Sequence, residues 1–342
     1  MLLTDFDYEL PQELIAQEGT VYREKSRLMV LEKDGSFTHH LFEDLISYLH
    51  SGDLVIVNDA RVAKARLLGR KETGGKIDCL LIPQKLNSAI REVYLRPSNV
   101  KVGTRLLFVE TFPGKETVTR AKVLERIGGS KFKLEFEDLS VIDRLGQLPI
   151  PPYIKKRLPD PERYQTIFSK KEGSLAAPTA GLHFTEDLIH TLKTLGVEFA
   201  HITLHIGIGT FAPIRTENVE AWTMHAECYE LTQENGDKIN RAIEQKRRIF
   251  AVGTTTVRTL ETITQNNKVT AGEGWTNIFI YPGYSFKFPY AGMLTNFHLP
   301  QSTLLLLGSA FAGKEKIFSA YREAIEKKYR FFSLGDAMLI LK

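Results

Sequence analysis

The chain has little cysteine and no long apolar run, which argues against a disulfide-rich, zinc-cluster or membrane-spanning protein. Only two cysteines, Cys79 and Cys228, occur in 342 residues, and they lie far apart in the sequence. This argues against a disulfide framework or a zinc cluster and favours a reducing cytoplasm. The most apolar run, residues 304–312, is shorter than the roughly 20 helical residues that cross a bilayer. It predicts a buried helix and no membrane contact.

The composition is that of a folded protein with an uneven distribution of charge. Hydrophobic residues make up 43% and charged residues 25% of the chain, and its length of 342 residues fits two domains. Residues 61–144 hold 18 Lys and Arg against 10 Asp and Glu, whereas the whole chain carries a net charge of only +4. Such a basic region is typical of a protein that binds a polyanion, although a merely solvated basic surface stays possible.

The basic region also differs from the rest in its pattern. Between residues 63 and 136, short alternating runs such as 76–82 and 131–136 are separated by glycine-containing turns. Closely spaced strands with such turns are typical of a small barrel or sandwich. We therefore predict an inserted β-barrel domain over residues 61–149.

Residues 1–60 and 150–342 show a different rhythm, in which helices and strands alternate. Thr185 can cap a helix in which one apolar stripe is formed by Leu188, Leu192 and Leu195. The strand 200–206 that follows has an apolar face and a polar face. A helix over 233–246, a strand over 249–252 and a further segment over 277–281 continue the alternation. This predicts an α/β fold, with an open mixed sheet and flanking helices, interrupted by the small β-barrel.

Ligands of open α/β sheets bind beyond the carboxyl ends of the strands, so the loops there are the first candidates. At 253–256 a strand becomes a helix, and free N–H groups with three threonine hydroxyls can hold a carboxylate or ribose oxygens; a simple helix cap is the alternative.

Residues 207–212 match the dinucleotide pattern G-x-G-x-x-A. We reject a dinucleotide site because the next helix start is predicted only at Thr216, and the alternative is a plain tight turn.

Histidines gather near these loops. His183 lies in a stretch of small residues, 176–185, before a helix, where it can carry protons near neutral pH or be an ordinary hydrogen-bonded group. His201 and His205 on one strand are about 13 Å apart by strand rise, too far to share an ion. No metal site is therefore expected.

Eight stretches together resemble one family, the S-adenosylmethionine:tRNA ribosyltransferase-isomerases of queuosine biosynthesis. The resemblance runs nearly end to end and implies an α/β domain interrupted by a β-barrel. It also implies that S-adenosylmethionine, as co-substrate, donates its ribosyl part to the 7-aminomethyl-7-deazaguanine base of tRNA, giving epoxyqueuosine, adenine and methionine. The matching stretches are residues 5–11, 58–62, 176–185, 203–211, 253–258, 274–284, 294–300 and 329–338.

Candidate site residues follow from the loops and from this resemblance. The arginines can instead form structural ion pairs, and the aromatic residues can instead be core. Catalytic candidates are His183, His205, His298 and Glu227; candidates for S-adenosylmethionine binding are Thr179, Gly181, Phe184, Gly207, Gly209, Thr210, Phe211, Gly253, Thr254, Thr255, Arg258, Tyr281 and Asn296; candidates for RNA binding are Arg61, Lys155, Lys156, Arg157 and Arg330.

Two rival functions stay open at this point. One is a non-catalytic tRNA-binding protein built on the basic barrel, and the other is an S-adenosylmethionine-dependent RNA methyltransferase. A methyltransferase would release S-adenosylhomocysteine, whereas ribosyl transfer releases adenine and methionine. We expect a monomer, because no coiled-coil pattern is present.

Overall fold

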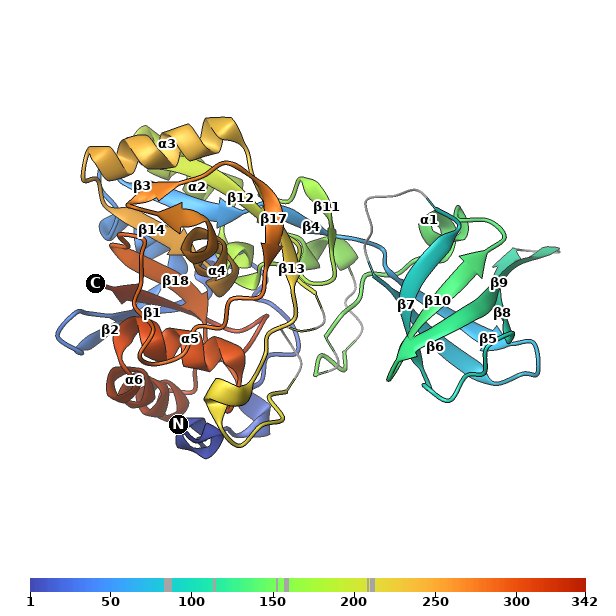
Figure 1. The fold of residues 1–342 in the computed structure, drawn as a ribbon. Coiled ribbons are helices and arrows are strands. Elements are labelled where there is room, and N and C mark those ends of the chain that lie inside the picture. The colour runs from blue at the N-terminus through green and yellow to red at the C-terminus, as the bar shows by residue number, and fades with distance from the viewer. Residues whose placement is uncertain (83–87, 113–114, 152, 157–159, 208, 210–212) are drawn as a thin grey trace. The chain divides into compact units, whose positions relative to one another are not determined.

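The computed structural model describes residues 1–82, 88–112, 115–151, 153–156, 160–207, 209 and 213–342 (Figure 1). The chain forms two compact units. We call the first the α/β unit; it comprises Met1–Arg61, Pro152–Lys171 and Ala177–Lys342. The second, the barrel unit, comprises Val62–Pro151 and Glu172–Ala176.

The α/β unit is built on a nine-stranded mixed sheet, as predicted. Its strand order is β17-β13-β12-β3-β14-β18-β19-β1-β2, and the four central strands β12, β3, β14 and β18 are parallel. Their carboxyl ends therefore meet at one edge. The strands are β1 (Arg27–Leu31), β2 (Phe37–Leu41), β3 (Leu54–Asn58), β12 (Glu198–Leu204), β13 (Glu227–Leu231), β14 (Ile249–Val252), β17 (Gly272–Thr276), β18 (Gly292–Asn296) and β19 (Ala337–Leu341).

Both faces of this sheet are covered, which explains why β14 and residues 54–57 of β3 are apolar on both faces. In β3, Leu54 and Ile56 belong to one hydrophobic cluster, whereas Val55 and Val57 belong to another. The first cluster is closed by α3 (Gln233–Glu244), α4 (Thr254–Ile263), α5 (Thr303–Ala312) and α6 (Lys314–Glu326), and the second by η4 (Phe42–Ser47), η6 (Thr179–His183) and α2 (Glu186–Thr194). Among the described residues, no helix is long and apolar enough to span a membrane.

Several local predictions are confirmed. The hydroxyl of Thr185 caps α2 by accepting from Leu188 N at 3.3 Å, and the apolar run 304–312 forms the buried helix α5. In β12, Ala200, Ile202 and Leu204 join one hydrophobic cluster, as the alternation indicates.

Three local predictions are wrong. Leu195 is exposed because α2 ends at Thr194. No strand forms over 277–281. The backbone of Ile278 bonds to side chains there instead of to a neighbouring strand: Ile278 N donates to Thr276 Oγ1, and Ile278 O accepts from Arg258. The helix expected from Thr216 is only the short turn η8 (Val219–Ala221), capped by Asn218.

The barrel unit is a closed six-stranded antiparallel barrel with strand order β10-β7-β6-β5-β8-β9, which confirms the predicted small barrel. Alternate side chains such as Leu67, Val93, Phe108 and Phe132 fill its interior. Its elements are β5 (Arg66–Lys71), β6 (Lys76–Leu81), β7 (Ile90–Arg96), β8 (Arg105–Phe112), β9 (Lys115–Gly128), β10 (Lys131–Phe136) and the helix α1 (Val141–Leu145).

Short elements complete the fold. Two-stranded sheets are formed by β4 (Ala60–Val62) with β11 (Lys171–Ser174) and by β15 (Thr264–Gln265) with β16 (Lys268–Val269). The remaining turns are η1 (Leu3–Phe6), η2 (Gln12–Leu14), η3 (Arg23–Lys25) and η5 (Pro161–Tyr164).

The packing of the barrel predicts an asymmetric response of two glycines to alanine. A Cβ on Gly69 would lie 2.7 Å from Leu107 O and 2.8 Å from the Phe108 ring, whereas a Cβ on Gly128 would meet nothing within 4 Å. Gly69→Ala should therefore lower the free energy of unfolding by about 1–3 kcal/mol, and Gly128→Ala should leave it equal or slightly higher. Denaturant unfolding of both variants checks this, and equal stabilities would contradict the tight contact.

Candidate functional site

A small pocket lies where the parallel strands end, and we call it the strand-end pocket. Residues following β14 and β18 meet η6 there, around a cavity of about 40 Å³. Its lining includes five residues predicted to bind the co-substrate and one predicted to be catalytic: Thr179, Gly253, Thr254, Thr255, Asn296 and His298. The position agrees with the general rule for ligand sites in open α/β sheets.

Asn58, at the carboxyl end of β3, fixes the geometry of this edge. Its amide nitrogen donates to Leu204 O at 3.1 Å and to Thr255 Oγ1 at 3.2 Å. Its amide oxygen accepts from Leu204 N at 3.1 Å and from Ala60 N at 3.0 Å. One buried side chain therefore connects the ends of β3 and β12 to the first turn of α4.

His183 is buried within a continuous chain of hydrogen bonds. Thr179 Oγ1 donates to Asn296 Oδ1 at 3.2 Å, Asn296 Nδ2 lies 3.1 Å from His183 Nε2, and His183 Nδ1 lies 2.7 Å from Ser26 Oγ. Ser26 Oγ in turn donates to Arg23 O at 3.0 Å. Since an amide nitrogen can only donate, the chain assigns a neutral imidazole with the proton on Nδ1.

Burial explains the neutral state of His183. Loss of water around the ring lowers its pKa to about 4, and Asp336 opposes this only in part. The ring also stacks on Phe42 with 5.0 Å between centroids. Both nitrogens are engaged, so His183 orients Asn296 in this arrangement rather than offering a free base.

His298 has a different environment. It is only 5% exposed but lines the strand-end pocket, and its Nε2 lies 2.9 Å from Thr295 Oγ1. Burial lowers its pKa to about 3, so the ring is neutral at physiological pH. Its backbone is held by Tyr8, whose hydroxyl donates to His298 O, and by Tyr321, whose hydroxyl oxygen accepts from His298 N at 2.9 Å.

Glu227 and Arg258 form a buried ion pair. Glu227 lies on β13, Arg258 lies on α4, and both side chains are almost fully inaccessible. Glu227 Oε1 also accepts from Gly207 N at 2.8 Å, so the pair fixes the backbone after β12. Among the described residues, one guanidinium nitrogen of Arg258, Nη2, has no hydrogen-bond partner.

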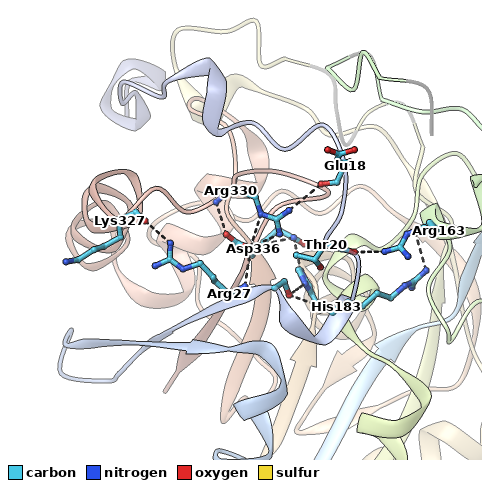
Figure 2. A network of polar contacts seen from close by, with 11 residues as sticks. Glu18, Thr20, Arg27, Arg163, His183, Lys327, Arg330 and Asp336 are labelled. Atoms are coloured by element: carbon cyan, nitrogen blue, oxygen red, sulfur yellow. Dashed lines mark hydrogen bonds and ion pairs between the residues drawn. The ribbon is translucent and has the colours of Figure 1, made fainter. Parts of the chain in front are cut away.

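Arg330 lies in the polar network of Figure 2. It donates to Asp336 Oδ1 from Nη2 at 2.8 Å and to Glu18 O at 3.4 Å. Asp336 is buried and also accepts from the backbone nitrogens of Arg27 and Arg330. The carboxylate is therefore satisfied inside the protein, and Arg330 is held in place by it.

The other residues predicted to bind RNA are placed as follows. Arg61 donates to both carboxylate oxygens of Glu162, at 2.7 and 2.9 Å, and to Ser169 Oγ. Lys155 and Lys156 are exposed, and Lys156 pairs with Glu18 at 3.1 Å. Arg157 lies outside the described residues.

The remaining candidates lie apart from the strand-end pocket lining. Phe184 is fully buried between Phe42 and Phe168, which favours its alternative interpretation as core. Tyr281 is half-buried against Phe279. Gly181 is packed against Thr166, and Gly209 is packed against His225. His205 is half-buried just beyond the end of β12, and its backbone N–H donates to Cys228 O. Thr210 and Phe211 lie outside the described residues.

Several polar residues of the region were not predicted. Asn58 directly follows the buried strand 54–57 and Thr295 precedes Asn296, so the rule of strand ends could have identified both. A second, larger cavity of about 260 Å³ is lined by Arg23 and Arg163, together with His183 and Ser333. Ser333 also lines the strand-end pocket. Arg23 and Arg163 lie in the short turns η3 and η5 and Ser333 lies in a turn before β19, where no sequence periodicity identifies them. Within the described part of the chain, no three potential metal ligands gather.

Comparison with known proteins gives full-length matches. A family described as "Queuosine biosynthesis protein" matches residues 3–340. Proteins named S-adenosylmethionine:tRNA ribosyltransferase-isomerase from Carboxydothermus hydrogenoformans and Staphylococcus epidermidis are 50% and 49% identical, each aligned over 100% of both chains. A crystal structure titled S-adenosylmethionine tRNA ribosyltransferase, from Thermotoga maritima, is 40% identical, covers 98% of this chain and 100% of its own, and has a TM-score of 0.57.

The buried pair Glu227–Arg258 should contribute far more to stability than the exposed pair Arg61–Glu162. Glu227→Gln leaves a buried, uncompensated guanidinium and should lower the free energy of unfolding by about 3–5 kcal/mol. Glu162→Gln removes a solvated partner and should cost less than about 1 kcal/mol. Urea denaturation of both variants measures the difference, and similar losses would show that burial does not set the energetics of these pairs.

The neutral buried histidines predict acid sensitivity. An unfolded histidine, with a pKa of about 6.5, binds a proton at pH 5, whereas His183 and His298 in the fold do not. The free energy of unfolding should therefore fall as pH drops from 7.5 to 5, by about 2 kcal/mol for each ring. Chemical denaturation across this range tests it. In His298→Asn the decline should be smaller by about 2 kcal/mol, and an unchanged slope would contradict the neutral assignment.

Proposed function

Because the chain belongs to the queuosine biosynthesis protein family, we propose that it is an S-adenosylmethionine:tRNA ribosyltransferase-isomerase. It transfers the ribosyl part of S-adenosylmethionine to the amine of 7-aminomethyl-7-deazaguanine at the tRNA wobble position and isomerises it. Epoxyqueuosine in tRNA, adenine and methionine are the products. The observation that carries this proposal is the full-length identity of 50% with a relative of that name.

The strand-end pocket is our proposed site for S-adenosylmethionine. Hydroxyls of Thr254 and Thr255 and free N–H groups in the first turn of α4 can bind ribose oxygens or a carboxylate. Asn296 adds an amide whose orientation is fixed by Thr179 and His183. The cavity of about 40 Å³ is much smaller than the roughly 300 Å³ or more of a typical ligand pocket, so its wall must open for the co-substrate.

We propose a residue for proton transfer from the accessibility of the candidate side chains. The reaction requires removal of an acidic C–H beside the sulfonium and protonation of the departing adenine. His298 lines the pocket as a neutral imidazole, which makes it our candidate for proton transfer. His183 is a positioning residue that acts through Asn296, and Glu227 is a positioning residue that holds the backbone at Gly207.

The direct test is to incubate the protein with S-adenosylmethionine and tRNA carrying the aminomethyl base, and to measure free adenine and the tRNA nucleoside mass. We expect one adenine for each epoxyqueuosine formed. His298→Gln should lower kcat by about 10²–10⁴-fold if it transfers a proton. His190→Gln, on the exposed face of α2, is the matched control and should leave kcat unchanged.

The alternative products separate the rival functions. Release of S-adenosylhomocysteine would indicate methylation, and tRNA binding without turnover would indicate a non-catalytic binding protein. Full activity of His298→Gln would leave the reaction in place and remove His298 from it.

A further inference from the structure

The larger cavity beside the strand-end pocket, which we call the arginine cavity, has no role in the function proposed so far. It has a volume of about 260 Å³ and is lined by Arg23, Arg163, His183 and Ser333 among others. His183 joins it to Asn296 of the strand-end pocket through a hydrogen bond, and Ser333 lines both. A ligand in the arginine cavity would therefore lie next to the proposed co-substrate site.

The two arginines differ from the other arginines of this region. Arg23 donates to Gln165 O at 2.9 Å and to Arg163 O at 3.3 Å, and Arg163 donates to Val21 O at 3.2 Å and to Thr20 O, as Figure 2 shows for Arg163 and Thr20. Neither forms an ion pair with a carboxylate among the described residues. Arg330 and Arg61, in contrast, are paired with Asp336 and Glu162.

The guanidinium groups of Arg23 and Arg163 are close enough to repel each other. Burial lowers the pKa of Arg23, the charge of Arg163 lowers it further, and the carboxylate of Asp160 opposes this only in part. An anion between or beside them would reverse this effect. Arg163 uses only Nη2 for its bonds within the described protein, so Nε and Nη1 are left to bind a ligand.

The two acidic residues of the cavity wall, Glu18 and Asp160, form no ion pair with either arginine among the described residues. Glu18 pairs with Lys156 at 3.1 Å, and the carboxylate of Asp160 caps η5 by accepting from Glu162 N at 2.9 Å. Asp160 acts on Arg23 only through space, since no ion pair joins them among the described residues, and it offsets part of the positive charge of the two guanidinium groups. The cavity has the chemistry of a site for a phosphate or carboxylate group.

The adjoining surface favours a nucleotide over a small carboxylate. Val21 and Tyr22 are 78% and 66% exposed, which is unusual for an apolar and an aromatic side chain next to each other. An exposed tyrosine beside arginines can stack on an unpaired base while the arginines bind its phosphate. Chemistry on a base requires that base to be outside the stack, so an unpaired nucleotide is expected at this site.

We propose that Arg23 and Arg163 bind a phosphodiester group of the tRNA next to the reacting nucleotide, an assignment that rests on the proposed function. The same anion chemistry exists in the carboxylate of S-adenosylmethionine. The experiment must therefore measure both ligands separately.

The test compares Arg163→Gln with Arg322→Gln, a matched control on the exposed face of α6. The dissociation constant for tRNA is measured at several salt concentrations, and that for S-adenosylmethionine by calorimetry. For Arg163→Gln we expect tRNA affinity to fall about tenfold and the slope of log K against log salt to shrink by about 0.7–0.9, one phosphate contact. Affinity for S-adenosylmethionine should be unchanged, and Arg322→Gln should match the wild type for both ligands.

A second variant guards against misfolding. Arg163 is exposed, whereas Arg23 is partly buried and contacts three backbone oxygens. Loss of the charge at Arg23 could disturb the fold, so the variant at this position is Arg23→Lys. Lysine keeps the charge and loses the planar pair of donors, so tRNA affinity should fall while most of the salt slope stays. Thermal unfolding confirms that each variant is folded.

Two results would overturn the proposal. Weaker binding of S-adenosylmethionine with an unchanged tRNA salt slope would assign the cavity to the carboxylate of the co-substrate. Unchanged affinity for both ligands would show that the arginines only tie backbone segments together. Absence of adenine release by the wild type would refute the proposed function alone, because the salt slope is measured without turnover.

Discussion

The candidate site depends on four parallel strands that end at the same edge of one sheet. Because β12, β3, β14 and β18 are parallel and in register, polar residues from four separate parts of the chain meet at that edge. Asn58 bonds to the ends of β3 and β12 and to Thr255, and so holds the edge together. The apolar strands supply the rigidity, and the residues just beyond them supply the chemistry.

The two buried histidines of this interior are neutral, and two of its buried carboxylates are paired with arginines. His183 and His298 are uncharged because charging a buried ring is costly, and the carboxylates of Glu227 and Asp336 form ion pairs with Arg258 and Arg330. The site thus offers oriented hydrogen-bond donors and acceptors rather than mobile charge. Such groups suit a cationic co-substrate, since a charged imidazole would repel a sulfonium.

The sequence predicts much of the fold and part of the site. The spacing of apolar residues identified the barrel, α2, β14 and the apolar helix α5. In each of these elements, that spacing reflects which side chains face the core and which face water. The loop at Gly253 followed from its place after a buried strand. The segment 277–281 was misjudged because its hydrophobic pattern does not reveal that the side chains of Thr276 and Arg258 bind the backbone of Ile278. Arg23 and Arg163 had no signal, since their proximity arises only when segments 140 residues apart pack together.

The order in which strands join the sheet has a consequence for protein synthesis. The barrel strands are all made by residue 136, whereas β3 pairs with β12 and β14, and β1 pairs with β19 at residues 337–341. At about 5–20 residues per second, β1 waits roughly 10–40 seconds after the last barrel strand is made. The barrel can fold on the ribosome during this interval. During this interval β1 can pair only with β2, which precedes the barrel in the chain, and its other edge stays open until β19 is made. The apolar strand β3 lacks both of its partners until β12 and β14 are made, so unpaired strand edges are exposed on the nascent chain.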